Sequence, residues 1–78
     1  ILIIYKSNIA KKNSILVDRL IKHGAIIIGK TNIPELAIGS HTTNKLYGVT
    51  ANAYDQSKTA GGSSGGAATA VAASSQLV

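Results

Sequence analysis

The chain carries the stretch TAGGSSGGAATAVAAS at residues 59–74, which joins a cluster of glycine and serine to a run of small residues. The Ala-rich part from Gly65 onward predicts a helix that packs closely against a neighbour, because its side chains are short. The cluster at residues 61–66 has the composition of a flexible linker. It is short, however, and no polar spacer separates it from the helix. We therefore interpret it as backbone in a conformation that side chains would forbid, which places a serine hydroxyl at the helix start.

Upstream of this stretch, the pattern predicts a helix and then a strand. Apolar residues recur at spacings of three and four over residues 14–23, which predicts an amphipathic helix with Asn13 as its N-cap and Gly24 as its stop. The β-branched run at residues 25–28 follows at once and predicts a strand buried on both faces, as in a parallel sheet. A helix followed by such a strand indicates an α/β fold.

A second, short helix is predicted from about Ile33. Asn32 can cap it with Glu35 three residues on, and Pro34 suits the first turn, where its missing N–H costs nothing. Residues 39–60 show no clear period and predict an irregular segment, longer than most loops and of the kind that is often functional. Phosphate binding by the glycine cluster is a weak alternative, because the lysine and hydroxyl residue that complete a P-loop do not follow Gly66.

The composition argues against nucleic-acid binding and against membrane insertion. The 78 residues are 45% apolar and carry a formal charge of +5, but the eight Lys and Arg are scattered, without the clustered basic patch that grips nucleic acid. There is no cysteine, and no apolar stretch reaches the roughly 20 residues that span a bilayer. These features favour a cytoplasmic protein that contacts neither nucleic acid nor membrane. A chain this small, without methionine, is expected to be a piece of a larger protein, truncated at both ends.

Residues 16–73 closely resemble the amidase signature family of serine hydrolases. Three blocks carry the resemblance in the family's order and at matching separations: GAIIIGKTNIPE, NKLYG and GGSSGG. The resemblance implies an α/β fold in which helices cover a mixed sheet, with residues 1–78 as one part of that domain. Ala53 and Ala60 stand where the family often has proline, and Ala67 where it often has a polar residue. These departures affect fine positioning rather than membership.

The resemblance implies amide chemistry through a Ser-cisSer-Lys triad. Ser63 matches the bridging serine, whose preceding peptide bond is cis in the family and whose hydroxyl relays a proton between the nucleophilic serine and a neutral lysine. The residues expected to support this loop are Gly61, Gly62, Ser64, Gly65 and Gly66. The nucleophile, the oxyanion hole and the lysine are expected outside residues 1–78. Lys6 and Lys30 do not match the family's catalytic lysine.

Substrate contacts carry over from the same resemblance. Ala37, Ile38 and Gly39 match a segment that lines the acyl side of the family's pocket, and their small size predicts an open wall. His23 and His41 are interpreted as solvated side chains. The acids Asp18, Glu35 and Asp55 form no carboxylate pair or metal site, so neither a metal nor a cofactor is expected. The expected partners are a small-molecule amide and the remainder of the enzyme, and a homodimer stays open.

Three functions compete. The first is a segment of an amidase that hydrolyses carboxylic amide bonds, inactive on its own. The second is the A subunit of glutamyl-tRNA(Gln)/aspartyl-tRNA(Asn) amidotransferase, a branch of the family that releases ammonia from glutamine and works with partner subunits. TNIPEL favours the first, because the amidotransferase branch more commonly has an acidic residue where Pro34 stands. The third is a non-catalytic binding module built around the glycine loop, for which Mg-dependent ATP binding would be the sign.

Overall fold

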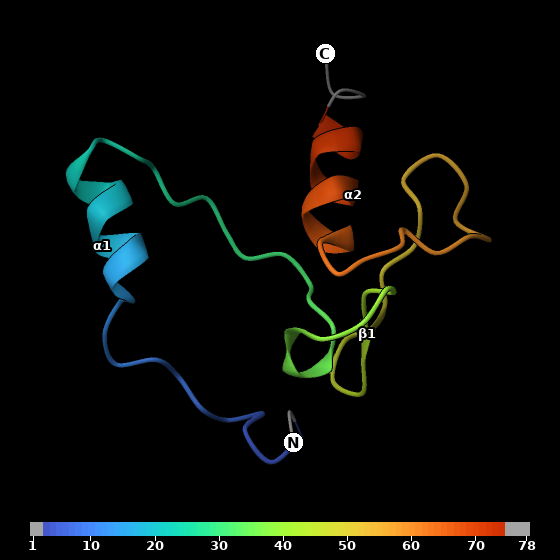
Figure 1. Cartoon of the computed structure of the whole chain (residues 1–78), viewed down its shortest axis with the longest axis horizontal. Helices are drawn as coiled ribbons and strands as arrows, with labels where there is room; N and C mark the ends of the chain where they lie inside the picture. The colour runs from blue at the N-terminus through green and yellow to red at the C-terminus, as the bar shows by residue number, and fades with distance from the viewer. Residues whose placement is uncertain (1–2, 75–78) are drawn as a thin grey trace.

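The computed structural model describes residues 3–74. Figure 1 shows α1 standing apart at one side, joined by an extended segment to a second region that contains α2 and a small hairpin. The elements in chain order are α1 (Ile15–Lys22), the 3-10 turn η1 (Glu35–Ala37), β1 (Thr43–Asn44), β2 (Gly48–Val49) and α2 (Gly65–Ser74). This content is compatible with a fragment of an α/β fold.

Helix α1 forms where its apolar period predicts it, but its cap lies one residue later than expected. The Ser14 hydroxyl accepts a hydrogen bond from the Val17 N–H at 3.3 Å, whereas the Asn13 side chain donates to the Asp18 carboxylate at 2.9 Å. Asn13 as the N-cap is therefore wrong. The stop at Gly24 is confirmed, because its φ of +93° lies in the left-handed region that favours glycine.

The strand predicted at residues 25–28 is wrong for the described part of the chain. These residues are extended but pair with no strand there, and Ile26 and Ile28 are 86% and 98% exposed. A strand forms only where a neighbour accepts and donates along its ladder, and apolar β-branched residues alone do not supply one.

The second helix is shorter than predicted. It is the single turn η1, which starts two residues after Ile33 and has Pro34 before it in an extended conformation. Leu36 and Ala37 take positive φ values of 57° and 58°, so the chain turns sharply instead of continuing as a helix. Asn32 does not cap this turn, since no side chain does.

Residues 39–60 are irregular, as predicted, with a small antiparallel hairpin inside them. Strands β1 and β2 pair Thr43 with Val49 and Asn44 with Gly48. Two backbone hydrogen bonds extend the hairpin on its far side, from the Thr50 N–H to the Thr42 carbonyl at 2.9 Å and from the Ala60 N–H to the Thr50 carbonyl at 3.0 Å. The segment thus returns the chain beside residue 42 before α2 begins.

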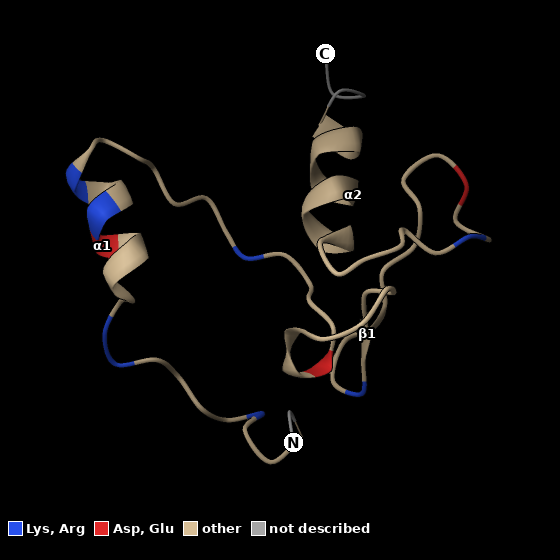
Figure 2. Cartoon of the chain, viewed as in Figure 1, with Lys and Arg blue, Asp and Glu red and all other residues tan. Residues whose placement is uncertain are grey.

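The interior of the described region is small and not apolar. Its buried residues are Pro34, Thr42, Asn44, Gly65 and Gly66, while apolar side chains such as Leu16 and Val71 are exposed. Figure 2 shows Lys and Arg spread from the first loop to the loop before α2, as the sequence indicates. Within residues 3–74, no helix has the length and apolar character that crossing a membrane requires. The five buried residues named above lie around the start of α2 and form no apolar core.

Candidate functional site

The serine cluster connects the hairpin region to α2. Ser63 and Ser64 directly precede α2. The Ser64 carbonyl accepts a hydrogen bond from the Ala68 N–H at 3.0 Å, and this bond begins the helix. The peptide bond between Gly62 and Ser63 is cis, as the family resemblance implies, and Gly61 has a φ of +75°. The two serines therefore stand at the N-terminal end of a ten-residue helix.

Thr42 holds this loop from the hairpin side. It is completely buried, and its Oγ1 lies 2.8 Å from the Gly61 carbonyl oxygen, 3.1 Å from the Ser63 carbonyl oxygen and 2.8 Å from the Gly65 nitrogen. The hydroxyl donates to the carbonyls and accepts from the Gly65 N–H. The sequence does not distinguish Thr42 from Thr43, because the two neighbours have the same side chain; the structure buries Thr42 and exposes Thr43.

At three positions of the cluster, a neighbouring segment comes so close to the backbone that only glycine fits. A Cβ at Gly62 would lie 2.9 Å from both the His41 carbonyl carbon and the Thr42 Oγ1. A Cβ at Gly65 would overlap the Thr42 side chain, and one at Gly66 would overlap the backbone of Asn32. Each of these glycines therefore lets a neighbouring segment touch the start of α2 or the loop before it, where a side chain would not fit.

A pair of asparagines ties the segment before η1 to the hairpin. Asn44 is 7% exposed, and its amide nitrogen donates to the Asn32 side-chain oxygen at 2.6 Å and to the Ile33 carbonyl at 2.9 Å. The Asn44 oxygen accepts from the backbone N–H groups of Leu46 and Tyr47. Asn32 in turn donates to the Thr50 hydroxyl at 2.9 Å. These bonds hold Asn32 beside Gly66. The prediction that Asn32 caps the short helix did not include this contact.

These contacts create a pocket of about 240 Å³ beside the serines. Its lining residues come from the segment before η1, from η1 itself and from the start of α2: Thr31, Asn32, Ile33, Pro34, Ala37, Ser63, Ser64 and Ala67. Of the three substrate-contact residues predicted, Ala37 lines this pocket with Ser63, whereas Ile38 and Gly39 do not. Ala67, where the family often has a polar side chain, adds to the apolar part of the wall.

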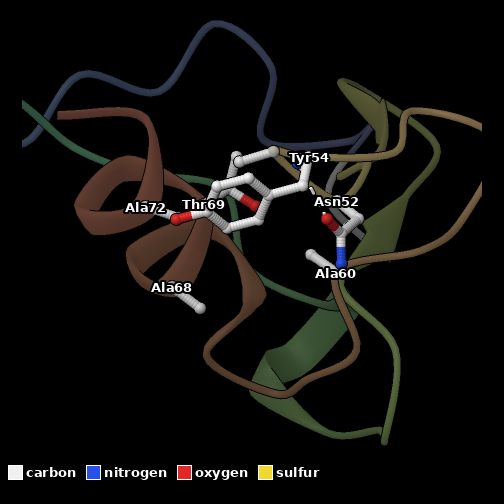
Figure 3. A pocket seen from close by; sticks show the side chains of 7 residues that line it. Asn52, Tyr54, Ala60, Ala68, Thr69 and Ala72 are labelled. Atoms are coloured by element: carbon white, nitrogen blue, oxygen red, sulfur yellow. Dashed lines mark hydrogen bonds between the residues drawn. The ribbon is translucent and has the colours of Figure 1, made fainter. Parts of the chain in front are cut away.

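Two further pockets in the described region are not lined by Ser63 or Ser64. One of about 550 Å³ adjoins the first and is lined by Lys30, Thr31, Asn32, Ile33, Asn44 and Tyr47. The other, about 110 Å³, lies between α2 and the loop before it, where Figure 3 shows Tyr54 beside Thr69 and Ala60 close by. Ala53 and Ala60, the two positions at which the family often has proline, line this smaller pocket, and neither lines the serine pocket.

Charged groups lie outside the serine pocket in the described residues. Asp55 pairs with Lys58 at 3.0 Å on the exposed loop before α2. Hydrogen bonds from Ser57 and the Lys58 ammonium hold the pKa of the Asp55 carboxyl below its ordinary value. Residues 3–74 contain no group of three or more His, Cys, Asp or Glu that could hold a metal ion. The side-chain hydroxyls among the residues that line the serine pocket are those of Thr31, Ser63 and Ser64.

Comparison with known proteins identifies the family. A model of the Amidase family matches residues 2–78. The A subunit of the glutamyl-tRNA(Gln) amidotransferase of Trichormus variabilis is 51% identical over 65 residues, which are 83% of this chain and 13% of the relative. The corresponding A subunits of Syntrophobacter fumaroxidans and Dehalococcoides mccartyi are 55% and 52% identical over 74% and 80% of this chain, again with 12% and 13% of their own lengths covered. No solved structure matches. The chain belongs to the Amidase family.

Proposed function

We propose that this chain is a segment of an amidase-signature enzyme that cleaves a carboxylic amide bond with Ser63 as the bridging serine of its triad. The observation that carries the proposal is that Ser63 and Ala37 line one pocket, at the start of α2, in a chain of the Amidase family. The segment spans 13% of the length of the first relative, so the proposal places the nucleophilic serine and the lysine in other parts of the enzyme. It also makes residues 1–78 one part of a helix-covered mixed sheet.

In this proposal Ser63 moves protons and does not attack the substrate. Its oxygen accepts the proton of the nucleophilic serine, while its own proton passes to the neutral amine of the lysine. The nucleophile then attacks the amide carbon, and the C–N bond breaks as the leaving nitrogen takes a proton back along the same path. Water afterwards cleaves the acyl-serine ester, which releases the carboxylic acid and restores the serine hydroxyl. Such relay roles typically contribute about 10²–10⁴-fold to the rate.

The relatives favour glutamine as the amide. The three relatives quoted above all bear the name of the glutamyl-tRNA(Gln) amidotransferase and are about half identical to this chain. We therefore propose the amidotransferase branch first, with ammonia released from glutamine. Hydrolysis of a simple amide is the second candidate, and Pro34 favours it: this residue, where the amidotransferase branch more commonly has an acidic side chain, lines the serine pocket.

The test is Ser63→Ala in the intact enzyme that contains this segment, with glutamine or a simple anilide as substrate. We expect the kcat to fall by about 100- to 10,000-fold while the KM changes little, because the relay acts in the chemical step. Ser57→Ala is the matched control, since Ser57 lies on the exposed loop and its hydroxyl bonds to Asp55.

Retention of wild-type kcat by a folded Ser63→Ala variant would falsify the proposal. Ammonia release that needs glutamine supports the amidotransferase branch, and turnover of simple amides without glutamine or partner proteins supports the second candidate. Saturable, Mg-dependent ATP binding without amide turnover would instead support a glycine-loop binding module.

A further inference from the structure

We infer that Thr42 is a positioning residue for Ser63: its buried hydroxyl joins the two ends of the glycine-serine loop, residues 61–65, and so holds in place the backbone that carries the Ser63 side chain. This inference rests on the function proposed above. Thr42 is not among the residues that line the serine pocket. It would therefore act on the reaction through Ser63 and not through the substrate.

The hydrogen bonds of Thr42 span the whole loop. Its hydroxyl carries one proton, which the Gly61 and Ser63 carbonyls share at 2.8 and 3.1 Å, and it accepts from the Gly65 N–H at 2.8 Å. These partners are the first residue of the loop, the serine itself and the first residue of α2. One side chain thus connects the entry of the loop, its reactive residue and its exit.

Thr42 is itself held in place. Its backbone N–H donates to the Gly61 carbonyl at 3.0 Å, and its carbonyl accepts from the Thr50 N–H at 2.9 Å. The side chain is fully buried, and Gly62 and Gly65 approach it so closely that a Cβ at either position would meet its Oγ1. Hydrogen bonds hold the backbone of Thr42, and close packing holds its side chain. A residue held in both ways can impose a fixed geometry on its partners.

The bond to the Ser63 carbonyl distinguishes Thr42 from an ordinary buried threonine. Thr69 offers the comparison, because its hydroxyl also bonds a distant backbone carbonyl, that of Ala51 at 3.0 Å. That bond fastens the middle of α2 to the loop before it and does not involve Ser63. Loss of either bond removes a tertiary contact of α2, but of these two threonines only Thr42 bonds the backbone of Ser63.

The experiment compares Thr42→Val, Thr42→Ser and Thr69→Val in the intact enzyme. Valine has the shape of threonine without the hydroxyl, so Thr42→Val is expected to lower the kcat by about 10- to 100-fold with the KM within about twofold of wild type. Thr42→Ser restores the hydroxyl and is expected to recover the kcat to within about threefold of wild type. Thr69→Val is expected to keep the wild-type kcat. Thermal unfolding of each variant shows that it is folded at the assay temperature.

The outcomes separate this inference from the proposed function. If Ser63→Ala keeps its activity, the proposed function fails; if Ser63→Ala is inactive but Thr42→Val keeps the wild-type kcat, only the positioning role of Thr42 fails. An equal loss in Thr42→Ser and Thr42→Val also overturns it, because the hydroxyl would then not be the cause. Should Thr42→Val not fold, Thr42→Ala decides by the same criteria, and unfolding of both variants overturns the inference in favour of a purely structural role.

Discussion

Individual polar side chains, more than apolar ones, determine the shape of the site. Thr42 and Asn44 are the buried polar residues of the described region, and between them they contact the glycine-serine loop, the segment before η1 and the hairpin turn. A buried polar group contributes to stability only while its partners are all present, and removal of one partner leaves the others unsatisfied. Substitutions that keep the shape but change the donors are therefore informative here.

At the residue scale, Asn44→Asp is expected to destabilise the protein by about 2–4 kcal/mol. The substitution keeps the oxygen that accepts from Leu46 and Tyr47, but it turns the donating nitrogen into an acceptor that faces the Asn32 and Ile33 oxygens. The thermal midpoint of the intact enzyme measures the effect.

The matched control for this prediction is Asn52→Asp. The Asn52 oxygen also accepts from two backbone N–H groups, those of Tyr54 and Asp55, and aspartate retains that capacity. Its thermal midpoint should stay near wild type. Equal midpoints for Asn44→Asp and wild type would show that the Asn44 donors contribute nothing.

At the element scale, α2 is held by contacts at its first turn and at its middle. Gly66 lies against the backbone of Asn32, and Thr69 bonds the Ala51 carbonyl, so the helix is fastened to two earlier segments. Its small residues allow this approach, as the sequence predicts. The hydroxyls of Ser63 and Ser64 therefore depend on α2 staying close to residue 32, because both serines line the pocket at its N-terminal end.

Gly66→Ala tests this dependence. The new Cβ would overlap the Asn32 backbone, so the first turn of α2 must shift, and we expect a loss of about 1–3 kcal/mol of stability together with a kcat at least about tenfold lower. Gly29→Ala is the control, because a Cβ there meets nothing within 4 Å and its φ needs no glycine. Steady-state kinetics and thermal melts of the two variants would refute the prediction if they coincide.

At the scale of the whole molecule, the described region lacks an apolar core. Its large apolar side chains are exposed on α1, on the extended segment and along α2, for example Leu16, Ile28 and Val71. Apolar burial is the main force that drives cooperative folding, and the few buried polar residues around the start of α2 do not replace it. The region is consistent with one part of a larger fold, as the proposal holds.

We therefore expect isolated residues 1–78 to show no cooperative thermal transition and no amide turnover. Near-ultraviolet circular dichroism follows the three tyrosines during heating, and an anilide assay follows turnover. The intact enzyme is the positive control in both measurements. A sharp unfolding transition of the isolated chain would show that it makes its own core, and measured turnover would show that it contains a complete site.

The sequence by itself determined the family, the helix α1 with its stop at Gly24, the small-residue helix α2 and the position of the serine cluster. These features follow from local signals: apolar period, glycine at a left-handed position, and a motif in register. The tertiary structure alone decided that residues 25–28 find no strand partner in the described region, that Asn32 bonds the hairpin instead of capping a helix, and that Thr42 rather than Thr43 holds Ser63. Each of these depends on a neighbour distant in the chain, which a local pattern does not specify.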